Sequence, residues 1–276
     1  AAQAAPPLIP AEQNAAPLYL EAAKLLQPHK YQWPDVGTKA GEGREEWRPD
    51  NLDGDGWANW SAPETVKALS AMLKSDDRAL ELVYQAASRP GCRFDLKWPD
   101  GIDMLLPHLS ELRLISSFCA VATAVAAAEE NAELTGQRLH ANVGLACHAA
   151  REPLVVSQMT THDIVGLAKC AAECALSRVV VPEPQARAIL SQVTGLDLTA
   201  TTVAALRTER AMAIEFYDIA RRTPSAITVL ISGLEARRLP GDWVWWVYAR
   251  GIPRMLNADE LAYLHYADWS LRTATL

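Results

Sequence analysis

The fold is decided by the uncharged stretch Leu114–Ala128, which reads LISSFCAVATAVAAA. This stretch is too short for a membrane span, which needs about 20 apolar residues. It consists mostly of alanine, valine and serine, and such small side chains let the backbones of neighbouring helices approach closely. We therefore predict a long buried helix from about residue 108 to residue 130, within a helical core.

Helical spacing continues on both sides of this stretch. In residues 11–26, Leu18, Ala22 and Leu26 recur at intervals of four, so they share one face of a helix. Apart from the short run Val179–Val181, no segment shows the period-two alternation of a β-strand. We expect further helices at about 61–74, 75–89, 132–150, 160–177, 182–195, 200–221, 224–238 and from 257 onwards. The predicted class is an all-α fold of antiparallel helical hairpins, arranged as a bundle or an irregular α-α array.

Local patterns predict where several of these helices begin or end. Ser61 and Glu64 have the spacing of a capping box, and Pro63 between them suits a first helical turn. The run Thr160–Asp163 predicts the start of the helix that continues to about residue 177. Gly195 is expected to end the helix that begins near residue 182, in the left-handed conformation that glycine favours.

The chain divides into a short tail and one helical domain. Residues 1–10 contain three prolines and are expected to be extended, and residues 11–276 are expected to form a single domain. Within that domain, residues 28–60 lose helical periodicity and carry Pro, Gly, Asp and four Trp residues. Because long irregular segments in compact domains often carry function, this loop-rich N-terminal segment is one place to look for a site.

Composition and charge exclude some partners. Half of the 276 residues are hydrophobic and 21% are charged, which is ordinary for a globular protein. The net charge of −7 and the lack of a basic cluster argue against nucleic acid, because such binding requires Lys and Arg to neutralise phosphates. No membrane span is predicted in this chain.

The start of the chain and its cysteines bear on the compartment. The opening residues AAQAAPP look like what remains after cleavage at small side chains, or like a linker after an anchor, so we expect an exported protein, periplasmic or at the cell surface. The five cysteines are odd in number and lack close pairs, which does not fit a disulfide framework. Four of them lie in alanine-rich helices, where a cysteine acts as a small buried hydrophobic residue.

The segment 51–64 contains a partial calcium-binding pattern. Oxygen-bearing side chains occupy the first, third, fifth and ninth positions, with glycine at the sixth, as in an EF-hand loop; they are Asn51, Asp53, Asp55 and Asn59. The twelfth position, however, is Ala62 rather than a bidentate glutamate. Asp-Gly-Asp-Gly is also common in ordinary turns, so a plain turn is the alternative. Calcium is the one cofactor that this pattern suggests.

Two groups of aromatic residues are candidates for binding. The first group lies around the same acidic segment and comprises Trp33, Trp47, Trp57 and Trp60. It suits glycan binding, because the rings can stack on the apolar face of a sugar while the neighbouring carboxylates accept hydrogen bonds from its hydroxyl groups. The second is a dense run that suits a protein partner, because Trp and Tyr are favoured interface anchors; it comprises Trp243, Trp245, Trp246 and Tyr248. In both cases the alternative is that the rings anchor their own segment to the helices.

Catalytic and metal-binding patterns are weak. Cys147, His162 and Asp163 are the best available set for a thiol nucleophile, but no recognised signature surrounds them. Cys170 and Cys174 lie one helical turn apart without the second pair that a zinc site requires, and His108 with Glu111 lacks a matching motif on another helix. We predict packing roles for these side chains and assign no catalytic residue.

Several short motifs resemble an uncharacterised family of exported or membrane-anchored helical proteins of environmental bacteria. They are Asn14–Tyr19, Pro90–Asp95, Leu106–Arg113, Ala205–Arg210 and Pro253–Asn257. The resemblance extends over most of the chain and implies an all-α fold with weak tetratricopeptide-like character. It implies no activity.

These observations together predict a non-catalytic helical scaffold or interaction protein. It would be part of a larger assembly, through a protein partner or through self-assembly. The alternative is a calcium- or glycan-binding module that uses residues 51–64 and the neighbouring Trp residues.

Overall fold

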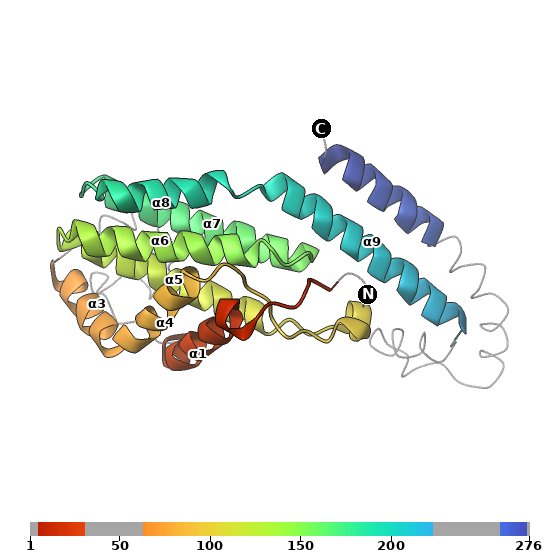
Figure 1. Cartoon of the computed structure of the whole chain (residues 1–276), viewed down its shortest axis with the longest axis horizontal. Coiled ribbons are helices and arrows are strands. Elements are labelled where there is room, and N and C mark those ends of the chain that lie inside the picture. Colours follow the sequence, from red (N-terminus) through yellow and green to blue (C-terminus); the bar gives the residue numbers. More distant parts are fainter. Residues whose placement is uncertain (1–4, 31–62, 223–259, 275–276) are drawn as a thin grey trace, which may run out of the picture.

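The computed structural model describes residues 5–30, 63–222 and 260–274, and every regular element within them is a helix (Figure 1). An isolated bridge between Asn14 and Gly91 is the sole β-type pairing in these ranges. The helices of the body are α1 (Ala16–Leu26), α3 (Pro63–Ser75), α4 (Asp77–Ala87), α5 (His108–Ala128), α6 (Ala132–Ala149), α7 (Val155–Leu176) and α8 (Glu183–Thr194). The predicted all-α, irregular array is confirmed.

Helix α5 forms the centre of the body. It packs most extensively against α6 and α7, and α1 and α3 cover further parts of it. Every residue from Phe118 to Ala127 is buried, so this half of the helix is enclosed on all sides. A helix that is apolar around its whole circumference is stable only in such a position. The uncharged stretch is therefore the core helix that its composition predicts.

Small residues let α6 lie close to its neighbours. A Cβ added at Gly144 would lie 3.0 Å from the Cβ of Ala87 on α4, and one at Gly136 would collide with Gln185 on α8. The buried guanidinium of Arg138, also on α6, donates a hydrogen bond to the Ala122 carbonyl of α5 at 2.5 Å. The two glycines thus bring α6 close to α4 and α8, and the Arg138 hydrogen bond joins it to α5.

One predicted helix start and one predicted cap conformation were wrong. Helix α7 begins at Val155 rather than at Thr160, because the Glu209 carboxylate from a distant helix accepts the Val155 backbone N–H at 3.3 Å. The Thr160 hydroxyl instead donates to the Val156 carbonyl within the helix. Helix α8 ends at Gly195 as predicted, but this glycine has φ of −81°, a right-handed rather than the expected left-handed conformation.

The last described elements form an arm that extends from the body. Helix α9 (Leu198–Arg222) contacts α7 and the short 3-10 helix η5 (Trp98–Asp103), and beyond them it projects outward (Figure 1). The helix 260–274 runs back along α9 in the antiparallel direction. Arg221 pairs with Glu260 at the far end of this hairpin, and Ala267 is buried in it. We call α9 together with residues 260–274 the arm.

Candidate functional site

Most of the residues predicted to bind a ligand or partner lie outside the described residues. This holds for the calcium candidates Asn51, Asp53, Asp55 and Asn59, for the glycan candidates Trp33, Trp47, Trp57 and Trp60, and for the partner-binding candidates Trp243, Trp245, Trp246 and Tyr248. The expected helix at 224–238 and the capping residue Ser61 lie outside them as well. Calcium, glycan and partner binding at these positions remain predictions.

The structure does not assemble the weak thiol-nucleophile candidate. The Cys147 thiol donates to the Gln192 carbonyl of α8 at 3.6 Å, and burial raises its pKa. His162 hydrogen-bonds through Nδ1 to the Gln158 carbonyl in its own helix, and Asp163 pairs with Arg113 at 2.8 Å. Each group has its own separate partner.

Cys92, Cys119 and Cys174 have the surroundings of packing residues. Burial raises the pKa of Cys92 and of Cys119 to about 12, and that of Cys174 to about 11. Because the thiolate is the nucleophile and the metal ligand, these shifts disfavour both roles. Within residues 5–30, 63–222 and 260–274, no three His, Cys, Asp or Glu residues group so as to hold a metal ion.

A buried polar pair joins α1 to α6. The Nε2 atom of His148 lies 3.0 Å from the Arg89 carbonyl, which can only accept, so this nitrogen carries the proton. The other nitrogen, Nδ1, therefore accepts from the Tyr19 hydroxyl at 2.9 Å. Burial, with a further contribution from the charge of Arg151, lowers the pKa of His148 to about 4. The imidazole is thus a neutral structural link.

A second buried cluster centres on Glu152, in the turn between α6 and α7. Its Oε1 atom lies 3.0 Å from Nε2 of His108 and accepts from the Ser157 hydroxyl at 2.5 Å. The ring of Phe94 stacks on His108 with centroids 4.2 Å apart. Both the histidine and the serine are bound to the carboxylate, so the serine is not oriented by the histidine as a nucleophile would be. The cluster fixes the turn against the start of α5.

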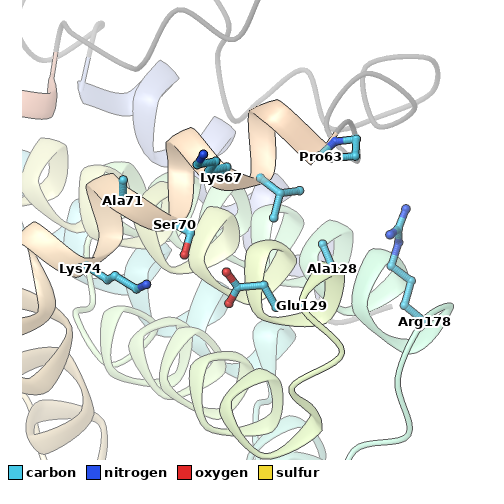
Figure 2. A pocket seen from close by; sticks show the side chains of 9 residues that line it. Pro63, Lys67, Ser70, Ala71, Lys74, Ala128, Glu129 and Arg178 are labelled. Atoms are coloured by element: carbon cyan, nitrogen blue, oxygen red, sulfur yellow. The ribbon is translucent and has the colours of Figure 1, made fainter.

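A surface groove of about 570 Å³ lies between α3 and the ends of α5 and α7 (Figure 2). Lys74 and Ser70 of α3 face Glu129, which follows the last turn of α5, and Arg178 stands on the far side. Lys67 completes the charged lining. Lysine and arginine side chains near helix C-termini complement the negative end of the helix dipole. The positions of Lys74 and Arg178, near the C-terminal ends of α3 and α7, are therefore explained by these helix ends.

The arm carries the most exposed large aromatic side chains of the described chain. Tyr266 and Trp269 have relative exposures of 64% and 62%, and their ring centroids lie 6.1 Å apart. Leu261, Ile214 and Ile219 are also exposed. At its base the arm is attached to the body, because Met212 is buried with Trp98 of η5 and Leu154.

Two helical stretches of the described chain meet the length and hydropathy of a membrane span. The first is His108–Ala128, where 78% of the apolar window is buried inside the protein. The second is Glu183–Ile219, where 11% is buried. The second stretch includes the non-helical residues 195–197 between α8 and α9. Most of it belongs to α9, and therefore to the arm.

Comparison with known proteins adds no relative. No family model, curated protein or solved structure matches the chain. The resemblance to an exported bacterial family, drawn from short motifs, therefore remains a prediction. The geometry itself defines a class: an irregular α-α array with an enclosed alanine-rich core and an attached helical arm that exposes an aromatic pair.

The sequence interpretation missed the aromatic pair on the arm. It selected the denser Trp run at 243–248 because local aromatic density was the criterion. A better signal was present in the spacing of Ala262, Tyr266, Trp269 and Thr273, which fall on one face of a helix. Whether such a face is exposed, however, depends on how the helix packs.

Proposed function

We propose that this protein is a helical scaffold that binds protein through its arm, as part of a larger assembly. The observation that supports it is the exposure of Tyr266 and Trp269 to more than half of their surface, on a helix whose opposite side buries Ala267. Soluble proteins rarely leave clustered large aromatic side chains uncovered, and Trp and Tyr dominate the energetics of protein interfaces.

The polar groups of the body support the same proposal. The buried histidines link separate segments: His148 of α6 bonds to Tyr19 of α1, and His108 of α5 bonds to Glu152 in the turn after α6. A scaffold needs such links, because they hold the helices in one arrangement while a separate surface binds. Export to the periplasm or cell surface remains a prediction.

The test combines solution mass with capture of partners. The purified chain is examined by size-exclusion chromatography with light scattering, and the same chain is used as bait in an extract of its native source. We expect an assembly or a specific partner that is lost when Trp269→Ala and Tyr266→Ala are combined. A control variant, Leu190→Ala, removes an apolar side chain of similar exposure (61%) on α8 and leaves the assembly intact. A lone monomer that captures nothing would refute the proposal.

A further inference from the structure

The apolar cluster at the base of the arm also includes the N-terminal segment. Met212 of α9 is buried there with Trp98 of η5 and with Leu154, which precedes α7, and Ala5 packs against the same cluster. The segment runs from the start of α1 toward η5 and α9 (Figure 1). We call residues 5–14 the strap. The cluster thus joins the arm, the body and the strap.

Two arginines that follow α4 hold the strap in place. The Nε atom of Arg93 donates a hydrogen bond to the Pro6 carbonyl at 3.0 Å. The guanidinium of Arg89 donates to the carbonyls of Ala11 and Asn14, at 2.8 and 2.6 Å. The Asn14 side chain donates to the Arg93 carbonyl at 2.9 Å and accepts the Arg93 backbone N–H at 2.8 Å. The strap is therefore attached along its length by hydrogen bonds.

The strap has no buried residues of its own. All of its residues are exposed or half-buried, and Leu8 has 83% of its surface exposed. Its three prolines, Pro6, Pro7 and Pro10, restrict the backbone before it docks and have no N–H that needs a partner. Docking therefore costs little chain entropy. Segments with few buried apolar contacts open at a lower free energy than the helical core, so the strap can open while the helices stay folded.

The cluster lies where the arm leaves the body. Met212 is the last residue of α9 that is buried in the described part of the chain. One turn earlier, the Glu209 carboxylate accepts the Val155 backbone N–H. From Met212 to Arg222 the helix extends about 15 Å further, at about 1.5 Å per residue. Because this part is a continuous helix, a small rotation at the cluster moves its far end, and Ala5 supports the arm at that point.

We propose that the strap controls the position of the arm. When it is docked, it fixes the arm at the observed angle to the body, and when it is released, the arm samples other angles. The inference rests on the proposed interaction function, because the angle of the arm decides how Tyr266 and Trp269 meet a partner.

The first experiment measures hydrogen exchange at the Val155 amide in the full-length chain, because this N–H is bonded to Glu209 of the arm. Ala5→Glu places a charge against the apolar cluster, where it has no partner, so the strap leaves. Leu8→Glu is the matched control, because it places the same charge at an exposed position of the strap. We expect exchange about tenfold faster in Ala5→Glu and unchanged in Leu8→Glu.

The second experiment releases the strap without changing the cluster. Arg93→Met removes the hydrogen bond to Pro6, and Arg187→Met removes an exposed arginine of α8 as the control. Spin labels on unnatural amino acids at Lys169 of α7 and Ala262 of the arm report the distance between body and arm. We expect a broader distance distribution in Arg93→Met than in the wild-type chain or the control. Loss of helical circular dichroism in Arg93→Met would overturn the inference, because release of the strap leaves the helices intact.

The two proposals fail differently, since neither measurement involves a partner. Unchanged exchange in Ala5→Glu together with an unchanged distance distribution in Arg93→Met refutes the role of the strap and leaves the interaction function standing. A chain whose arm loosens as expected but that captures no partner refutes the interaction function and leaves the strap's control of the arm standing.

Discussion

Acid should destabilise this protein through one buried histidine. His148 is 5% exposed, its Nδ1 accepts from Tyr19, and burial is the main cause that lowers its pKa to about 4. In the unfolded chain the pKa of a histidine is about 6.5. Between these two values the unfolded state binds a proton that the folded state does not. The free energy of unfolding must therefore fall as the pH falls from about 6.5 to about 4.

The size of this effect follows from the shift. Each unit of pKa difference corresponds to about 1.4 kcal/mol, so lowering the pH from 7.5 to 4.5 should remove about 2–3 kcal/mol through His148 alone. Other groups titrate over the same range. His148→Gln is therefore the reference, because the amide keeps one donor and one acceptor at this position but carries no titrating group.

The assay is urea denaturation of both chains at pH 7.5 and pH 4.5, followed by circular dichroism. We expect the wild-type chain to lose about 2–3 kcal/mol more than His148→Gln between these pH values. Tyr19→Phe should destabilise the protein by about 1–3 kcal/mol at pH 7.5, because it leaves the buried Nδ1 without a donor. Parallel pH profiles for wild-type and His148→Gln would show that the imidazole is not held neutral by its surroundings.

Substitutions at four further positions test the packing and the helix caps. Gly166→Ala should stabilise the protein by up to about 1 kcal/mol, because no neighbouring atom lies within 4 Å of the added Cβ. Gly144→Ala should instead destabilise it, because the added Cβ would lie 3.0 Å from Ala87, and thermal melts of the two variants test this difference. Asn131→Ala should cost about 1 kcal/mol in urea denaturation, since its side chain caps α6; no change would mean that the cap contributes nothing. Glu209→Ala should raise the rate of hydrogen exchange at the Val155 amide, whereas Glu209→Gln should preserve its protection, because the amide oxygen can still accept the Val155 N–H. Equal exchange in both variants would contradict the proposed cap.

The sequence alone determined the fold class and the core helix. Residues 114–128 contain no charge and mostly small side chains, so they can be stable only where other helices surround them. The positions of most helices also followed from local spacing, since an amphipathic helix places its apolar residues at intervals of three and four. These features depend on residues close together in the chain.

Tertiary structure decided the helix start at Val155, the roles of the buried polar groups and the exposed face of the arm. Glu209 caps α7 from 54 residues away, and Tyr19 meets His148 from 129 residues away. No local pattern encodes such pairings, because they depend on where two helices cross. The same reason explains why Tyr266 and Trp269 were missed: spacing places them on one face of a helix, but only the packing of that helix against α9 turns this face to the solvent.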